Sequence, residues 1–534
     1  MMILRALRRL CLSLCLAAHA VHAYRPPLRY FASCCRGLEE VLASELSGPR
    51  IRSPEVRVGK SGCEFDGDMG VLLRAGLEAR TATKVMELLA CEAGVETAQD
   101  LYDVARNVPW DALMRVDGTL RVDTTLGREP SAALTHSHFS SLTVKNAIVD
   151  SFRAGNRLGS RPSVDTKACD VPVHLYVDYD EARLYRAVAS ESLHKRGYRG
   201  DVAHKAALRT TVAAGLLYLA DWPAKAAAGA VLCDPMCGSG TLPVEAALMA
   251  RDVAPGLIRA GFGPAGPPSE APLRFACTTW LDFDGDAWDA ALGAALGRAL
   301  PRAPAQILAS DAHDGALRLA KDGARRASVD RDVVFARGDA ATLALGAKPD
   351  VVVSNPPWDG RLDGAEEAWD ALGAFLRREA PGATAHALTG NMAVTRNLRM
   401  RASSKRKLVS GGVDLRFLKY EVRGGTPKTE AAPAEAEAEA PAEPEAKPAA
   451  RKPARAPARA PTVVVAAAAP SPWGAAPSPW GPAPDAAVPI AGAADYATRT
   501  VVELKDLLRA RKLKVSGRKA ELVSRLEAHD VDAR

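Results

Sequence analysis

Two short runs of the chain combine strand-like apolar residues with groups that could do chemistry. The first is VLCDPMCGSGTLPVE at residues 231–245, and the second is DVVVSNPPW at residues 350–358. Each opens as an apolar run of the kind found in buried parallel strands and then breaks at Gly or Pro. Open α/β sheets bind their ligands at the carboxyl ends of such strands. We therefore expect both runs to border one ligand site.

The second run presents three groups that suit one substrate atom. Pro356 and Pro357 have no N–H and a fixed φ, so the loop is stiff and the Pro356 carbonyl stays free. Asn355 adds an amide oxygen and Trp358 an aromatic face. Two acceptors can hold both hydrogens of a nucleobase exocyclic amine while the ring stacks on the base. A methyl sulfonium placed in line would then need only positioning and electrostatics. The same four residues are also compatible with an ordinary turn.

These residues carry a resemblance to a known family. DPMCGSGT (residues 234–241) and NPPW (residues 355–358) resemble the signature motifs of the S-adenosylmethionine-dependent nucleobase amino-methyltransferases. More narrowly, the chain resembles the branch with an N-terminal THUMP domain, the rRNA large-subunit guanine-N2 methyltransferases. The runs YFASCCRGLEEVLASEL and SESLHKRGYRG are similar to that branch as well. The family usually has Tyr where Trp358 stands and a second Asp where His313 stands.

The resemblance implies S-adenosylmethionine as cofactor and RNA as partner. The spacing of the cysteines and histidines predicts no metal site. The resemblance also implies that the amine is held by a catalytic loop, Asn355, Pro356, Pro357 and Trp358. The candidate cofactor residues each end a predicted strand or lie in the glycine loop; they are Asp234, Pro235, Gly238, Gly240, Thr241, Asp311 and Asp339. A carboxylate at Asp311 suits a ribose diol, and one at Asp339 suits the adenine amine. Any single Asp could instead cap a helix.

The catalytic domain, residues 201–423, alternates predicted strands with helices. The strands are predicted at residues 230–234, 306–311, 333–338, 350–354 and 383–388, followed by a hairpin around Gly411 and Gly412. This order is typical of an α/β fold, a doubly wound parallel sheet with an antiparallel edge. Glycine turns at 238 and 240 should lead into a helix at residues 242–251. In a long insertion, residues 252–305, we expect Phe275, Trp280, Phe283 and Trp288 to pack a subdomain on this sheet.

An N-terminal α+β module is predicted at residues 29–200. Helices are expected at residues 37–46, 69–78 and 143–154, and strands at residues 120–125, 173–178 and 184–189. The resemblance implies a ferredoxin-like segment plus a THUMP domain that binds RNA. The basic residues that we place near phosphates, with a solvated surface charge as the alternative for each, are Lys145, Arg153, Arg161, His194, Lys195, Arg196 and Arg199. His136 and His138 have no metal-ligand partners at fixed spacing, which favours exposed loop histidines.

The ends of the chain differ in composition from its centre. Residues 1–23 carry three arginines before an apolar run and no acidic residue, which predicts a cleavable targeting segment. The layout of this segment favours a plastid over a mitochondrion as the destination, and a secretory signal peptide is the alternative. The ten cysteines form no repeated CxxC pairs, which indicates a reduced compartment. Residues 424–494 read as a disordered Ala/Pro-rich linker. Residues 495–530 resemble a SAP domain, a small helical nucleic-acid-binding module. We expect two apolar stripes there, one of Leu504, Leu507 and Leu508 and one of Leu522, Val523 and Leu526.

Together these patterns predict an RNA methyltransferase that acts on the N2 amine of a guanine, with organellar large-subunit rRNA as the expected substrate. The formal net charge of +7 is compatible with a nucleic-acid partner. Two alternatives remain open from the sequence. One is an adenine-N6 methyltransferase acting on DNA or RNA, which the SAP-like tail would favour. The other is a nucleic-acid-binding scaffold with an inactive enzyme core.

Overall fold

The computed structural model describes residues 29–155, 160–199, 208–262, 275–358 and 364–423. In the tail it describes residues 496, 504, 507–508, 511, 513, 519 and 522–526. The chain divides into two compact units, residues 1–433 and 434–534. The predicted leader and linker lie outside the described residues. Within the part that the structure describes, no helix has the length and apolarity needed to cross a membrane.

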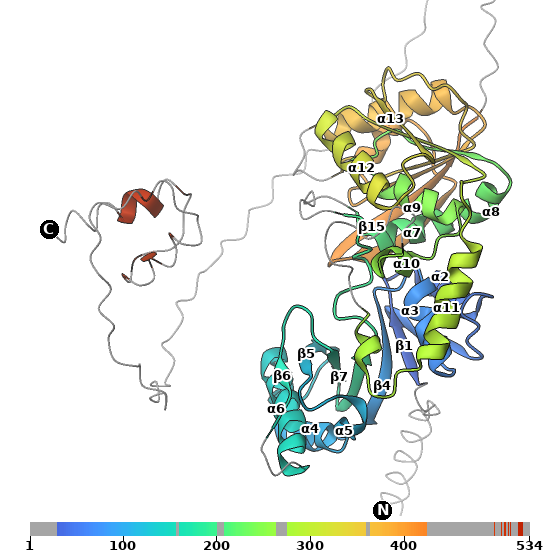
Figure 1. The fold of residues 1–534 in the computed structure, drawn as a ribbon. Helices are drawn as coiled ribbons and strands as arrows, with labels where there is room; N and C mark the ends of the chain where they lie inside the picture. The colour runs from blue at the N-terminus through green and yellow to red at the C-terminus, as the bar shows by residue number, and fades with distance from the viewer. Residues whose placement is uncertain are drawn as a thin grey trace, which may run out of the picture. The chain divides into compact units, whose positions relative to one another are not determined.

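The N-terminal module is built on one eight-stranded sheet in the order β2-β3-β1-β4-β8-β7-β5-β6 (Figure 1). Its strands are β1 (Tyr30–Ser33), β2 (Val56–Gly59), β3 (Gly62–Phe65), β4 (Lys84–Glu92), β5 (Thr119–Leu126), β6 (Ser163–Val164), β7 (Val171–Asp178) and β8 (Glu181–Ala187). Its helices are α2 (Glu39–Ser47), α3 (Met69–Glu78), α4 (Ala98–Arg106), α5 (Trp110–Leu113), the short η1 (Ala132–Leu134) and α6 (Ser137–Gly155).

The strand β4 is the element that joins the two parts of the N-terminal sheet, β1–β3 and β5–β8. It pairs antiparallel with β1 on one side and with β8 on the other. Its first half is buried and its second half is half-exposed, with a register shift between Leu88 and Ala90. The sequence did not predict β4, because a strand that changes environment halfway along lacks one clear alternation. The two parts therefore share a sheet and form a single rigid platform.

The catalytic half carries a seven-stranded sheet in the order β11-β10-β9-β12-β13-β15-β14. Its strands are β9 (Val231–Asp234), β10 (Gln306–Asp311), β11 (Val333–Arg337), β12 (Val351–Ser354), β13 (Thr384–Thr389), β14 (Ser404–Ser410) and β15 (Val413–Glu421). The first five run parallel, as predicted. The hairpin also forms, with Gly411 and Gly412 both at positive φ. The predicted antiparallel edge is confirmed: β15 pairs antiparallel with β13, and β14 forms the edge and pairs antiparallel with β15.

Helices cover both faces of this sheet. One face packs on α7 (Thr210–Leu219), α9 (Thr241–Ala250) and α12 (Asp314–Arg326) and shares its apolar core with the N-terminal module. The other face packs on α13 (Ala365–Glu379), through Trp369, Leu372 and Phe375. The short α8 (Trp222–Ala227) lies beside α9, and η3 (Val394–Leu398) beside α13. This is the doubly wound arrangement that places ligands outside the carboxyl ends of the strands.

The insertion before β10 packs differently from our expectation. It contains α10 (Pro255–Arg259), η2 (Ala276–Thr279) and α11 (Gly285–Arg298). Its aromatic residues do not lie on the catalytic sheet: α11 packs on α3 of the N-terminal module, and the Arg186 guanidinium of β8 stacks 3.8 Å from the Trp280 ring centroid. Arg186 also binds Asp282 at 2.5 Å. The insertion packs there because its Trp280 and Asp282 complement the Arg186 cation of β8 and its apolar helix α11 complements α3. A sequence pattern does not show such complementarity. The insertion thus joins the two halves of the unit.

In the second unit, the described residues form a small apolar cluster. Tyr496, Leu504, Leu508, Leu522 and Leu526 are buried, with Leu507 and Val523 packed against them. These are the two apolar stripes expected of the SAP-like tail.

Candidate active site

Four polar side chains follow four neighbouring strands of the catalytic sheet. Asp339 follows β11, Asp311 ends β10, Asp234 ends β9 and Asn355 follows β12, and these strands are adjacent in the order β11-β10-β9-β12. All four strands are parallel, so their carboxyl ends meet at one edge. The chain order reverses across β9, which makes this edge a topological switch point. The fold therefore brings the predicted cofactor carboxylates and the predicted catalytic loop to the same side of the sheet.

The glycine loop after β9 is fixed from β10 and α12. Asp311 Oδ2 accepts a hydrogen bond from the Gly238 N–H at 2.9 Å. Gly238 and Gly240 have φ of +53° and +78°, a region that favours glycine. A Cβ at Gly240 would lie 2.7 Å from the Ala320 Cβ, whereas a Cβ at Gly238 would meet nothing within 4 Å. The loop is thus closely packed on its helix side and open at Gly238, which suits a ligand approaching the backbone.

Asp234 is fully enclosed beneath that loop. Its Oδ1 accepts from the Ser354 hydroxyl at 2.8 Å and from the Met236 N–H at 3.2 Å. Burial raises the pKa of Asp234 to about 7, and these two hydrogen bonds offset only part of that effect. A buried carboxyl of this kind gains most from a nearby positive charge. Its bond to Ser354 also links the glycine loop to the strand that carries Asn355.

Two tryptophan N–H groups fix the NPPW loop. The buried Trp369 of α13 donates from Nε1 to the Pro357 carbonyl at 2.9 Å. Trp358 donates from Nε1 to Asn355 Oδ1 at 3.2 Å. The Trp358 indole lies against Gly390, where an added Cβ would be 2.3 Å from the ring atom Cζ3. The Asn355 amide is therefore oriented by the neighbouring indole, and base stacking by Trp358 stays a prediction.

The two outer aspartates accept backbone hydrogen bonds in this structure. Asp311 accepts from Gly238 and also from the His313 N–H at 2.9 Å, and Asp339 accepts from the Ala341 N–H at 2.8 Å. Asp339 thereby caps the turn that follows β11. Their contacts with a cofactor stay predictions. Each carboxylate still has lone pairs for a ligand, because a carboxylate accepts about four hydrogen bonds.

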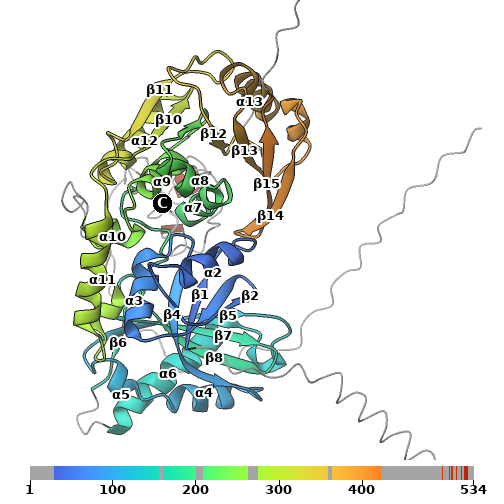
Figure 2. The ribbon, with the colours of Figure 1, turned by 90° about the vertical axis from the view of Figure 1, so that its right-hand side faces the viewer.

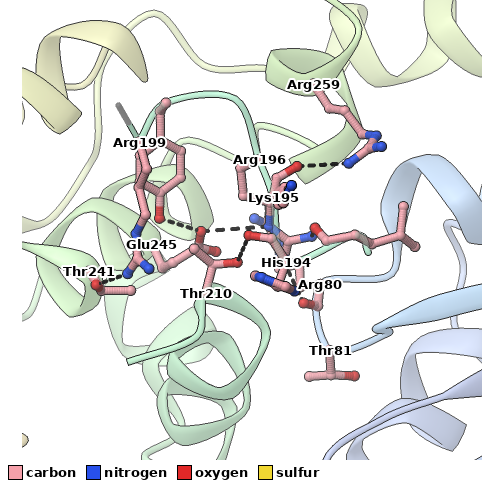
Figure 3. Close-up of polar contacts among 12 residues, drawn as sticks. Arg80, Thr81, His194, Lys195, Arg196, Arg199, Thr210, Thr241, Glu245 and Arg259 are labelled. Carbon is pink, nitrogen blue, oxygen red and sulfur yellow. Dashed lines mark hydrogen bonds and ion pairs between the residues drawn. The ribbon is translucent and has the colours of Figure 1, made fainter. Parts of the chain in front are cut away.

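The segment between the two halves, residues 193–199, corrects two predictions (Figure 3). Arg196 does not lie near phosphates: it is 4% exposed, donates to the carbonyls of Leu193 and Arg80, and lies 3.7 Å from Glu245 of α9. Arg199 donates to the Leu208 carbonyl and to the Thr241 hydroxyl. Both guanidiniums instead join the N-terminal module to the helix that follows the glycine loop. Basic residues in a sequence do not reveal which ones turn inward.

The remaining residues of this segment have separate roles. His194 is partly enclosed, and burial together with neighbouring cations lowers its pKa to about 4, so it is neutral at physiological pH. Lys195 is exposed and pairs with Glu191. Tyr198 donates to Glu245 at 2.8 Å within the core. Sequence reasoning missed Tyr198, Glu245, Ser354, Trp369 and Gly390, and no motif could have found the last three, because their roles arise from contacts across the fold.

Comparisons with known proteins agree with this geometry. Residues 196–419 match the family described as RMKL-like methyltransferase domain. Residues 29–86 match the RlmL ferredoxin-like domain, residues 95–186 the THUMP domain and residues 495–531 the SAP domain. A putative RNA methyltransferase of Synechocystis sp. is 32% identical over 397 residues, which are 74% of this chain and 96% of that protein. The chain belongs to the RMKL-like methyltransferases that carry a THUMP domain.

Other relatives match the chain over different shares of their own length. A ribosomal RNA large subunit methyltransferase K/L of Syntrophotalea carbinolica is 35% identical over 406 residues, 74% of this chain but 54% of that protein. The chain thus spans about half the length of this K/L relative. A possible methylase from Clostridium difficile 630 shares the fold, with a TM-score of 0.63 at 24% identity over 76% of this chain and all of that one. Another neighbour, a putative methyltransferase complexed with SAH, has a TM-score of 0.63 at 20% identity over 75% and 99%. The cofactor of this family is S-adenosylmethionine.

Proposed function

We propose that this protein is an S-adenosylmethionine-dependent RNA methyltransferase that acts on the N2 amine of a guanine in large-subunit ribosomal RNA. The observation that carries the proposal is the oriented Asn355 amide at the open edge of the sheet, next to the loop that holds Asp234. The K/L names of the relatives support the ribosomal substrate. The predicted targeting segment supports an organelle, a plastid before a mitochondrion.

The residues on this edge fit the cofactor. Asp234 offers a buried carboxyl that a cation would ionise, and the open side of Gly238 leaves room at the backbone. Asp311 and Asp339 offer acceptors at the ends of the next two strands. When bound, S-adenosylmethionine supplies a methyl group on an activated sulfonium. No strong general base is required of the protein, because a fixed geometry and aligned acceptors supply most of the rate enhancement.

The catalytic loop would hold the target amine. Asn355 Oδ1 has two lone pairs and uses one for Trp358, so one is left for an amine hydrogen. The Pro356 carbonyl is the second acceptor, since the Trp369 bond goes to the Pro357 carbonyl instead. The target base must leave its stack to reach this loop. After the transfer, the surplus proton of the nitrogen leaves to solvent.

Asn355→Ala tests this assignment. We expect turnover to fall by about a hundredfold or more, the scale of losing one preorganised polar contact, while cofactor affinity measured by calorimetry stays unchanged. Near-normal turnover in this variant would remove the role given to Asn355. If the wild-type chain did not bind the cofactor, the inactive scaffold would be favoured instead. The presence of Asp311, Asp339 and Asn355 argues against that alternative.

An adenine-N6 methyltransferase is the second candidate, because the same acceptor pair fits any exocyclic amine and the SAP domain at residues 495–531 suits a DNA partner. Mass spectrometry of digested ribosomal RNA and DNA from a knockout separates the two. We expect N2-methylguanine to be lost from large-subunit ribosomal RNA of one organelle. Loss of N6-methyladenine with N2-methylguanine unchanged would establish the second candidate instead.

A further inference from the structure

An exposed basic surface lies at the β14 edge of the catalytic sheet. Between Asn391 and Lys407 the chain has six cationic residues and no acidic one. All six side chains are exposed. We call this surface the basic edge; its residues are Arg396, Arg399, Arg401, Lys405, Arg406 and Lys407. The sequence prediction placed the phosphate contacts in the N-terminal module and did not consider these residues.

The backbone that carries the basic edge is held in place by buried and backbone contacts, and most of the cationic side chains take no part in them. Leu398 is fully buried, and its carbonyl accepts from Arg377 at 3.1 Å. The same carbonyl lies against Gly373 of α13, where a Cβ would be 2.7 Å away. Arg399 has a φ of +54°, an uncommon conformation for a residue other than glycine. The cations therefore project from an ordered scaffold.

Some of these cations are already engaged and some are not. Arg399 pairs with Asp370 at 3.3 Å and Lys407 with Asp414 at 3.1 Å. Arg406 donates to the Gly37 carbonyl at 3.3 Å, at the point where β14 meets the N-terminal module beside α2 (Figure 2). Within the described residues, Arg396, Arg401 and Lys405 have neither an ion pair nor a side-chain hydrogen bond. These three keep their full charge for a ligand.

The basic edge is connected to the NPPW loop through Gly390 and the register of the sheet. The strand β13 ends at Thr389, and the next residue is Gly390, which contacts the Trp358 indole. The sheet register aligns Thr389 with Arg416 of β15 and Arg416 with Lys407 of β14. Lys407 is thus two strand spacings, about 10 Å, from the end of β13. Lys407 therefore lies level with the carboxyl end of β13, and Lys405, level with Ala387, lies two residues further from that end.

We propose that the basic edge binds the phosphates of the RNA strand that carries the target base. This inference rests on the proposed function and adds the path of the substrate. Charge complementarity identifies the partner, because cations on a rigid scaffold bind a polyanion mainly through release of its counterions. Lysines on an edge strand can also prevent that strand from pairing with the sheet of another molecule. That role predicts aggregation when the charges are removed, whereas RNA binding predicts a change in salt dependence.

The test compares two double variants of the full chain. Arg401→Ala with Lys405→Ala removes two of the three unengaged cations. Lys321→Ala with Arg326→Ala is the matched control, one Lys and one Arg exposed on α12 at the other edge of the sheet. Binding of a short labelled single-stranded RNA, and of the same sequence as duplex DNA, is measured by fluorescence anisotropy over a range of salt concentrations. Cofactor affinity is measured by calorimetry, so a failure of the cofactor site is seen separately.

We expect the first variant to bind the RNA several-fold more weakly at low salt. The slope of log affinity against log salt should become shallower by about 1.4, or about 0.7 for each lost contact. The control should keep the wild-type slope, and so should the charge-preserving Arg401→Lys with Lys405→Arg. An unchanged slope with a greater tendency to aggregate would overturn the proposal in favour of edge protection. A shallower slope on DNA alone would overturn the RNA assignment while leaving cofactor binding intact.

Discussion

The hydrogen bond from Trp358 to Asn355 leads to a specific prediction about catalysis. Trp358→Phe removes the N–H that lies 3.2 Å from Asn355 Oδ1 and keeps an aromatic ring for the base. A hydrogen bond of this kind contributes about 0.5–1.5 kcal/mol. If that energy orients the amide in the transition state, turnover should fall about two- to tenfold. Cofactor affinity should not change, because the indole belongs to the loop that we assign to the target amine.

Gly390 provides an independent check on the same contact. A Cβ at this position would lie 2.3, 2.5 and 2.8 Å from three atoms of the indole ring, so Gly390→Ala must displace the ring. The two closest of these atoms, Cζ3 and Cε3, belong to the outer ring of tryptophan, which phenylalanine lacks. Gly390→Ala should therefore reduce turnover strongly in the wild-type chain and only weakly in the Trp358→Phe background. The double-mutant cycle should show that the two effects are not additive.

Transfer of labelled methyl groups from S-adenosylmethionine to unmodified large-subunit ribosomal RNA, at saturating concentrations of both, measures this turnover. Calorimetric cofactor affinity and thermal unfolding serve as controls for folding. Two results together would refute the reasoning: wild-type turnover in Trp358→Phe, and strictly additive effects of the two substitutions. They would mean that the amide is oriented by its backbone alone.

Two further predictions concern pH and stability. Burial raises the pKa of Asp234 to about 7, so a cationic cofactor should bind up to about tenfold more weakly for each pH unit below 7, with proton release seen by calorimetry in two buffers. Because its pKa is raised in the folded state, protonated Asp234 adds to the free energy of unfolding at low pH, and this contribution is lost as the pH rises through about 7. Asp234→Asn should abolish the pH dependence of cofactor affinity and that of stability. Arg196→Met should cost about 3 kcal/mol in the free energy of unfolding by urea, because it leaves Glu245 buried beside Tyr198 alone. The exposed neighbour Lys195→Ala should change it by less than about 0.5 kcal/mol, and equal losses would argue against the buried pair.

The local sequence determined the elements of the catalytic sheet and the order in which they occur. The runs at residues 231–234, 306–311 and 351–354 are short and mostly apolar; the first two end in Asp and the third is followed by Asn355, so strand and loop could be recognised from neighbours along the chain. The glycines at 238 and 240 predicted a tight turn into a helix, and both have the positive φ that few other residues adopt at low cost. The two leucine-rich stripes of the tail were visible for the same reason: their period is local.

Tertiary structure alone decided which polar groups meet and which charges are exposed. Arg196 and Lys195 are adjacent in sequence, yet one is enclosed against Glu245 and the other faces solvent. The sequence is compatible with packing of the insertion on either half, and the contacts of Arg186 with Trp280 and Asp282 place it against the N-terminal module. Gly390 and Trp358 are far apart along the chain and touch only because β12 and β13 are neighbours in the sheet. Contacts of this kind depend on burial and shape across the whole unit, and residue spacing contains no information about them.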